Sequence, residues 1–399
     1  MLTALRFPDE VPFNLLRFRD IMNMRGLSHK EKEFFQNSGQ LCGLCYREDI
    51  EMYLRTSHIA GFHLLSLADT HVSGTSLTGM LNVFNKTKNI MTPEQWRCFC
   101  SDRVALIRMD RFTYRSGEQL KGCLQFANYG SGAIYGAVPY WSLSDGACVL
   151  IQGKLDAVDI PQGGLYDLGE VELSLSCTAP CVYTLQVGIE NGPANSYPIW
   201  VYPEERELTI PDEIKVALEW EEASAALAKG EKVLYFPANL PLSKALNGEF
   251  ASNFWSYTMF RKISLERGNA VPAGTMGISC DPNHPSLSLF PNRGYSEWQW
   301  YPIVTNGAFA VLDNFPKEFE PIIWGIDNPM RGSKLGLLFE MKVGPGSLLV
   351  CMSRLPDMQD SPPTAWMYRS IIAYMASKDF SPAVTIDDGF LSNFFTSNK

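Results

Sequence analysis

A dense group of polar side chains follows the short apolar run 59–67. Asp69 and His71 come first, and Ser73 and Thr75 follow at the same spacing. A carboxylate in such a loop can bind the hydroxyl groups of a sugar or support a neighbouring catalytic group. Hydrolysis of a glycosidic bond needs two carboxyl groups about 5–9.5 Å apart, whereas this loop has one well-placed carboxylate. The opposite interpretation stays open, in which Asp69 caps a turn and His71 is a surface residue.

A second group combines tryptophans with polar side chains. Trp298 and Trp300 flank Gln299, and His284 lies in an Asp-Pro-Asn-His-Pro segment shortly before them. The flat indole ring of a tryptophan matches the C–H face of a pyranose and can stack on it. Packing of these large rings at a domain interface is the alternative, and it is the commoner role of such residues. Metal binding by His284 is not expected, because the neighbouring ligands are too few.

The sequence lacks the short motifs of common catalytic sites. It contains no Gly-x-Ser-x-Gly elbow, no Walker loop and no His-Glu-x-x-His. Cys280 is not surrounded by the Gly-x-Cys-x-Gly pattern of an amidotransferase nucleophile. Cys42 and Cys45 form a C-x-x-C, but a zinc site would need two such pairs folded together. We therefore expect neither a metal nor a cofactor.

Composition and charge argue against two classes of protein. The 399 residues carry a net charge of −9, from 34 basic and 43 acidic side chains, without the clustered Lys and Arg that nucleic-acid binding requires. The longest uncharged stretch, 122–144, is interrupted by Gln125, Asn128 and Pro139, so we expect no membrane span. Residues 1–20 lack the unbroken apolar segment of a secretory signal. Neither nucleic acid nor a membrane is an expected partner, and the compartment stays open.

The elements that must position these residues begin with a helical region. Residues 15–55 have a helical pattern, and the apolar run 59–67 is predicted to be a strand covered on both faces. A polar loop follows, and Pro93 begins a further helix. A helix, a buried strand and a polar loop are typical of one βα step of a (β/α)8 barrel, whose loops after the strands hold the active site. We therefore expect residues 1–103 to be a partial C-terminal segment of such a barrel.

The second region, residues 104–203, has the pattern of a β-sandwich. Short runs of alternating apolar residues are separated by turns such as Asp145-Gly146 and Asn191-Gly192. About seven strands in about 100 residues are expected of an immunoglobulin-like β-sandwich. The predicted strands are 112–114, 120–129, 138–143, 148–155, 170–175, 182–189 and 199–202.

The third region, residues 214–380, is predicted to be an α/β domain. Residues 214–218 and 232–236 are predicted strands that flank an Ala-rich helix, which makes a βαβ unit. Further strands are expected on either side of Gly344-Pro345-Gly346. We expect this domain to be Rossmann-like, similar to a glutamine amidotransferase domain without its nucleophile, and non-catalytic. Residues 381–399 are expected to form a tail, and the fold class is mixed and multidomain.

Extended stretches of the chain carry the pattern of a known enzyme family. They are 34–56, 61–69 and 74–81 toward the N-terminus, and Gly274-Thr275-Met276-Gly277, 281–285, Trp298-Gln299-Trp300 and 334–340 toward the C-terminus. The first set resembles the last part of the barrel in large bacterial glycoside hydrolases of the family 2, or β-galactosidase, type. Those enzymes continue with an immunoglobulin-like sandwich, and the second set is similar to their α/β appendage. The resemblance covers most of the chain.

The resemblance implies a retaining hydrolysis of β-glycosides by two glutamates. In that family both glutamates lie on earlier barrel strands, which would precede Met1, so no catalytic residue is assigned in this chain. The chain has Ser66 where relatives have an Asp, and it keeps the family's second acid at Asp69. Asp69 and His71 are therefore the expected substrate-binding residues. Trp298 and Trp300 are the expected sugar-stacking residues.

The expected function is that of the C-terminal portion of a glycoside hydrolase, inactive without the upstream barrel. The expected partners are a carbohydrate substrate and either the missing barrel half or further copies of the chain. The alternative is a non-catalytic module that binds carbohydrate or mediates assembly. Relatives of this type are often exported, with an export signal upstream of the region that this chain covers.

Overall fold

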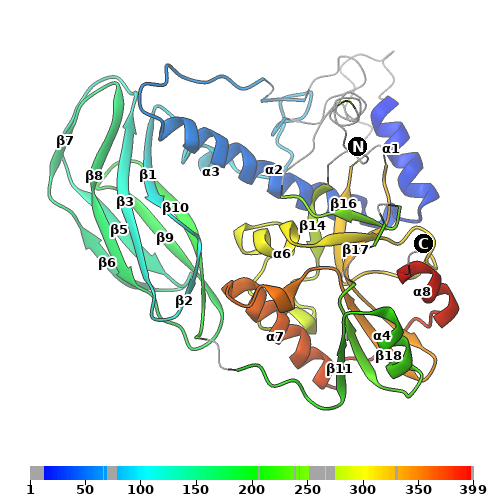
Figure 1. Cartoon of the computed structure of the whole chain (residues 1–399). Coiled ribbons are helices and arrows are strands. Elements are labelled where there is room, and N and C mark those ends of the chain that lie inside the picture. Colours follow the sequence, from blue (N-terminus) through cyan, green and yellow to red (C-terminus); the bar gives the residue numbers. More distant parts are fainter. Residues whose placement is uncertain are drawn as a thin grey trace. The chain divides into compact units, whose positions relative to one another are not determined.

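The computed structural model describes most of the chain as two compact units. It covers residues 13–65, 67–69, 79–204, 207–237, 240–241, 243–250, 266, 275–328 and 331–396. Unit 1 is drawn from 1–42, 66–88 and 207–399, and unit 2 from 43–65 and 89–206. Both units combine helices with β-sheets (Figure 1). The predicted mixed, multidomain α/β fold is confirmed at this level.

The N-terminal region is helical, as the sequence predicts. Helix α1 spans Phe13–Met24, a short 3-10 turn follows at Ser28–Lys30, and helix α2 spans Glu31–Leu54. The shorter helix α3 (Pro93–Arg97) begins with a capping box. The Thr92 hydroxyl accepts a hydrogen bond from the Gln95 N–H at 3.2 Å, and Gln95 Oε1 accepts one from the Thr92 N–H at 2.8 Å. This exchange satisfies N–H groups that the helix start would otherwise leave without partners.

Most of unit 2 is built from two mainly antiparallel sheets that share one core. Each predicted strand of this region overlaps an observed one, because alternating apolar residues mark one buried face. Leu124 and Val171 from one sheet and Leu185 and Ile199 from the other belong to a single hydrophobic cluster. The three-stranded sheet has the order β1 (Arg103–Met109), β3 (Gln119–Asn128), β8 (Gly164–Ser174). The five-stranded sheet has the order β2 (Thr113–Arg115), β10 (Ala194–Tyr202), β9 (Cys181–Ile189), β5 (Pro139–Ser144), β6 (Val149–Lys154), and its strand β2 runs parallel to β10. Two short strands, β4 (Ile134–Ala137) and β7 (Val158–Ile160), pair with each other.

Unit 1 contains a mixed sheet of eight strands. The predicted βαβ unit is present as β11 (Ile214–Ala217), helix α4 (Trp220–Leu227) and β12 (Lys232–Tyr235), with the two strands parallel. The sheet continues through β18 (Gly346–Cys351), β17 (Leu335–Val343), β15 (Ala308–Val311) and β13 (Ala245–Asn247), and β16 (Ile323–Asp327) joins β17 to β14 (Thr275–Cys280). Two further helices, α6 (Tyr301–Thr305) and α7 (Pro362–Ala376), and three 3-10 turns, at Pro285–Leu287, Trp298–Trp300 and Leu355–Asp357, accompany it.

The C-terminal segment differs from the tail expected at 381–399. It contains helix α8 (Asp388–Phe395), which begins where an Asp387 carboxylate oxygen accepts a hydrogen bond from the Phe390 N–H at 3.0 Å. The Phe395 ring lies 4.8 Å from the Trp220 ring, and Trp220 Nε1 donates to Ser392 Oγ at 2.8 Å. A capped start and an apolar face are enough to dock a short helix, so this segment is part of the unit 1 core.

The apolar run 59–67 also differs from its prediction. Residues 59–65 form no strand, and the Leu65 side chain is 79% exposed. The pairing described nearby consists of two isolated bridges, between Ala68 and Leu81 and between Leu81 and Thr87. An apolar run becomes a buried strand only when neighbouring strands satisfy its backbone groups and cover its faces, so the expected barrel strand is wrong here. Ser66 lies outside the described residues.

The packing of α8 predicts a large stability effect at Phe395 and a small one at Phe62. Phe395→Ala removes a buried ring and is expected to lower the free energy of unfolding by about 3–5 kcal/mol. Phe62→Ala removes a partly exposed ring from the segment that forms no strand and should cost about 1 kcal/mol or less. Urea-induced unfolding of both variants measures the difference. Equal losses would contradict the docking of α8.

Candidate functional site

Asp69 forms a buried ion pair with Lys88 and is not an exposed loop residue. Its side chain is buried, and Oδ1 lies 2.7 Å from Lys88 Nζ and accepts the Gly79 N–H at 2.9 Å. Lys88 Nζ also donates to the Gly79 carbonyl at 2.6 Å. Burial raises the pKa of Asp69, and the opposing effects of Lys88 and the Gly79 N–H do not cancel this rise. The carboxylate therefore links residue 69 to Gly79 and Lys88, and a ligand would have to displace Lys88 to reach Oδ1.

The other predicted sugar-site residues fall in three different environments. His71 lies outside the described residues. Trp300 is fully buried, with its ring 4.8 Å from that of Phe290 in an edge-on contact, so its expected sugar-stacking role is wrong. Trp298 is half-buried and belongs to a cluster of aromatic side chains that reaches the surface.

This aromatic cluster consists of Phe250, Trp298 and Tyr301. The Trp298 ring lies 5.8 Å from Phe250 in a stacked arrangement and 6.1 Å from Tyr301, and the Phe250 and Tyr301 rings are 5.5 Å apart. Tyr301 is 49% exposed. The cluster offers flat apolar rings at the surface, which is the feature that a sugar ring can stack on.

Local geometry explains why Trp298 and Trp300 differ. Residues Trp298–Trp300 form a 3-10 turn that continues into α6, which begins at Tyr301. Residues three apart lie on the same side of such a turn, so Trp298 and Tyr301 share one face while Trp300 points into the core. The spacing of three residues between Trp298 and Tyr301 is the feature of the sequence that could have predicted Tyr301 as a member of the cluster. Phe250 follows β13 and is brought to the cluster by the fold, so no local pattern could have predicted it.

A carboxyl group lies next to the aromatic cluster along the chain. Glu249 immediately precedes Phe250 and is half-buried. Burial raises the pKa of Glu249, and the Arg331 guanidinium lowers it by a smaller amount. Arg331 also forms an ion pair with Asp327 at 2.6 Å. Binding sites for small polar ligands combine apolar rings with a few such polar groups.

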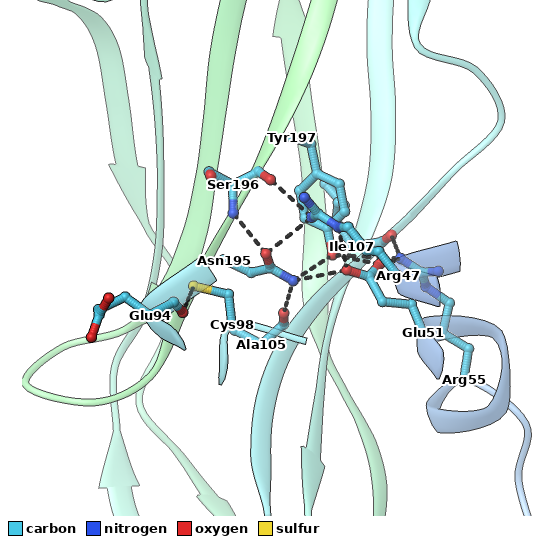
Figure 2. A network of polar contacts seen from close by, with 10 residues as sticks. All are labelled: Arg47, Glu51, Arg55, Glu94, Cys98, Ala105, Ile107, Asn195, Ser196 and Tyr197. Atoms are coloured by element: carbon cyan, nitrogen blue, oxygen red, sulfur yellow. Dashed lines mark hydrogen bonds and ion pairs between the residues drawn. The ribbon is translucent and has the colours of Figure 1, made fainter. Parts of the chain in front are cut away.

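The densest polar network of unit 2 surrounds Glu51 (Figure 2). The Glu51 side chain is fully buried. Arg47 Nε donates to Oε1 at 2.9 Å and Arg55 Nη2 donates to Oε2 at 2.6 Å. Asn195 Nδ2 and the Tyr197 hydroxyl each donate to the carboxylate at 3.0 Å.

The Glu51 network is structural, because the carboxylate oxygens are already engaged. Burial alone would lower the pKa of Arg47, but the neighbouring Glu51 raises it above its ordinary value. Burial and the same carboxylate raise the pKa of Tyr197. Asn195 and Arg55 extend the network by donating to the backbone carbonyls of Ala105 and Ile107, at 3.2 and 3.0 Å. The network thus fastens the C-terminal half of α2 to strands β1 and β10.

The described residues lack two features, a group of metal ligands and a membrane-spanning helix. Within these parts of the chain, no group of three or more His, Cys, Asp or Glu side chains is placed to hold a metal ion. The helices of the same parts include none that is both long and apolar enough to cross a membrane.

Removal of the Glu51 charge is predicted to destabilise unit 2. Glu51→Gln leaves two partly buried guanidinium groups without their anion, which should cost about 3–5 kcal/mol in the free energy of unfolding. Asp49→Asn, on the exposed face of the same helix, is the matched control and should change it by about 0.5 kcal/mol or less. Urea unfolding followed by circular dichroism tests both. A Glu51→Gln variant as stable as Asp49→Asn would refute the role of the network.

The raised pKa of Asp69 predicts a pH-dependent stability difference. Because the folded-state pKa lies above the ordinary 3.8, the protonated form is favoured by folding. The stability of the wild type relative to Asp69→Asn should be greatest below pH 3.8 and fall as the pH rises through the folded-state pKa. Thermal unfolding of both proteins across this range measures the difference. A difference that grows with rising pH would mean that Lys88 dominates the site.

Comparison with known proteins gives matches to two domain families and to parts of several structures. Residues 216–396 match the model of a "Domain of unknown function (DUF8487)", and residues 118–203 match a "Domain of unknown function (DUF8488)". No curated protein matches the chain in sequence.

The similar solved structures are distant. They include the alkylpurine DNA glycosylase AlkC of Pseudomonas fluorescens bound to DNA (12% identity, TM-score 0.22, 26% of this chain and 31% of that chain). A CARDB domain from Pyrococcus furiosus has 11% identity and a TM-score of 0.21, over 26% of this chain and 94% of that chain. A cycloisomaltooligosaccharide glucanotransferase from Paenibacillus sp. has 13% identity and a TM-score of 0.21, over 45% of this chain and 31% of that chain. TM-scores this low establish neither a shared fold nor a shared function.

Proposed function

We propose that this chain is the C-terminal portion of a glycoside hydrolase that acts on β-glycosides, and that it contributes a sugar-contacting surface. In this proposal the two catalytic glutamates belong to an upstream barrel. Unit 2 is an immunoglobulin-like sandwich, and helix α2 derives from the end of the barrel. The sequence resemblance and the order of helix, sandwich and α/β region support this assignment.

The observation that carries the proposal is the aromatic cluster Phe250, Trp298 and Tyr301. It presents aromatic rings at the surface, and the half-buried Glu249 precedes Phe250 in the chain. Stacking of a pyranose on such rings requires no metal and no cofactor. Asp69 has a different role in this proposal: it supports the chain around it through Lys88.

The engagement of Asp69 favours binding without catalysis as the second candidate function. The best carboxylate of the N-terminal segment is occupied by Lys88 and the Gly79 N–H, so it is not free to act on a substrate. A carbohydrate-binding or assembly module would use the same aromatic cluster. The two candidates differ in whether an upstream barrel completes an active site.

Sugar binding is predicted to depend on Trp298 and Tyr301. Calorimetric titration of the chain with β-galactosides and uronic-acid oligosaccharides should give saturable heat with at least one of them. Trp298→Ala and Tyr301→Ala should each weaken binding about tenfold, equal to about 1.4 kcal/mol. Trp366→Ala is the matched control, since Trp366 is also half-buried in unit 1 and lies in α7, and it should bind as the wild type does.

Two outcomes would contradict this proposal. The absence of heat with every sugar, or undiminished binding by Trp298→Ala, would remove the sugar-contacting role. Turnover of an aryl β-glycoside by the purified chain, abolished in Asp69→Asn, would instead place catalysis in this chain.

A further inference from the structure

Two cysteines lie where the chain crosses between the two sheets of unit 2. Strand β8 belongs to the three-stranded sheet and β9 to the five-stranded sheet, so residues 175–180 connect one sheet to the other. Cys177 lies within this connection, and Cys181 is the first residue of β9. Both side chains are half-buried and pack against the core that the two sheets share. The crossing therefore brings two thiols to the same core.

Hydrogen bonds from outside the cysteine pair hold the backbone of this connection. The Cys177 N–H donates to Ser116 Oγ at 3.0 Å, and the Tyr183 hydroxyl donates to the Ser176 carbonyl at 2.7 Å. Tyr183 lies two residues after Cys181 on β9, so the two side chains share one face of that strand. These contacts set the position of Cys177 relative to Cys181 independently of any interaction between the two sulfurs.

The two thiols also interact with each other. A side-chain hydrogen bond joins them, and it favours the proton on Cys177 and the thiolate on Cys181. Burial, together with the neighbouring Cys181, raises the pKa of Cys177 to about 12, and burial also raises the pKa of Cys181. A disulfide forms without backbone movement only where two cysteines approach closely, and sulfurs that share a hydrogen bond meet this requirement.

We propose that Cys177 and Cys181 are a redox-sensitive modification site, which a small disulfide such as oxidised glutathione converts into an intramolecular disulfide across the connection between the two sheets. An oxidising compartment would maintain this bond, and a reducing one would keep the two thiols. The modification goes beyond the proposed sugar-binding role and does not rest on it.

The reaction is a thiol–disulfide exchange in two steps. Cys181 loses its proton to solvent, and its thiolate attacks one sulfur of the small disulfide, which breaks the S–S bond and releases one thiolate. The Cys177 sulfur then loses its proton and attacks the Cys181 sulfur of the mixed disulfide, which releases the second thiolate. Solvent protonates both released thiolates. The protein loses two hydrogen atoms, and the small disulfide is reduced to two thiols.

Mass spectrometry of the folded, full chain after incubation with oxidised glutathione tests this site. Remaining thiols are alkylated, and the chain is digested with trypsin, which cleaves after Lys154 and Arg206. The peptide 155–206 contains Cys177 and Cys181 and no other cysteine. It should lack both alkyl groups and be lighter by two hydrogen atoms than the dithiol peptide, and dithiothreitol should reverse the change. The initial rate should rise about tenfold per pH unit below the thiol pKa, because the thiolate attacks.

Three variants test the assignment of the two cysteines. Cys177→Ser should accumulate glutathione on Cys181, because no second thiol resolves the mixed disulfide. Cys181→Ser should form no bond within peptide 155–206. Cys148→Ser is the matched control, since Cys148 is an exposed cysteine of the same unit, and it should form the bond as the wild type does. Circular dichroism shows whether each variant is folded.

Several results would overturn the proposal. Peptide 155–206 alkylated at both cysteines at every glutathione concentration would exclude the modification. A disulfide that joins this peptide to peptide 122–154, which contains Cys123 and Cys148, would assign the bond to a different pair. A bond that forms in urea but not in the folded chain would show that the native structure keeps the two sulfurs apart.

Discussion

A carboxylate that is fully buried must be compensated by charge and hydrogen bonds, and Glu51 imposes this requirement on unit 2. Arg47 and Glu51 are four residues apart on one face of α2, and Arg55, four residues further, directly follows the helix end. Asn195 and Tyr197 are two residues apart on β10, which places them on one face of that strand. The network therefore fixes which face of the helix meets the strands. Side chains spaced four residues apart along the helix and two residues apart along the strand thus meet at the Glu51 carboxylate.

The same network also covers one edge strand of the sandwich. The side chains that neutralise Glu51 also occupy two carbonyls of β1, so this edge of the three-stranded sheet is closed to other strands. The acidic side chains of β8 keep the opposite edge solvated. Strand β6 lies in the five-stranded sheet, and its side chains remain outside the shared core. The edges of the sandwich thus differ in their chemistry.

Unit 1 places its candidate site by long-range packing. The 3-10 turn at Trp298–Trp300 divides its two tryptophans between the surface and the core, and Phe250 approaches from the end of β13. Buried polar groups hold the surrounding framework. Lys334, for example, donates to the carbonyls of Pro316, Lys317 and Phe319 at 2.9 to 3.2 Å. Such a lysine stabilises a loop through carbonyl acceptors.

The sequence by itself determined where most of the sandwich strands, helix α2 and the βαβ unit form. Alternating apolar residues marked the strands of unit 2, and the Ala-rich helix between two apolar runs marked the βαβ unit of unit 1. Helix α2 followed from its periodicity. These features depend on a few neighbouring residues, and a face that can be buried is visible in them.

Only the tertiary structure decided which faces are buried and by what. Residues 59–65 have the composition of a strand but form none, whereas Glu51, Trp300 and helix α8 are covered by residues distant in the sequence. The site follows the same rule, since Trp298 was predicted from the sequence and Phe250 was not. Local patterns report what a segment can bury. The partner that buries it is set by the packing of the whole unit, because the energy of a contact depends on both surfaces.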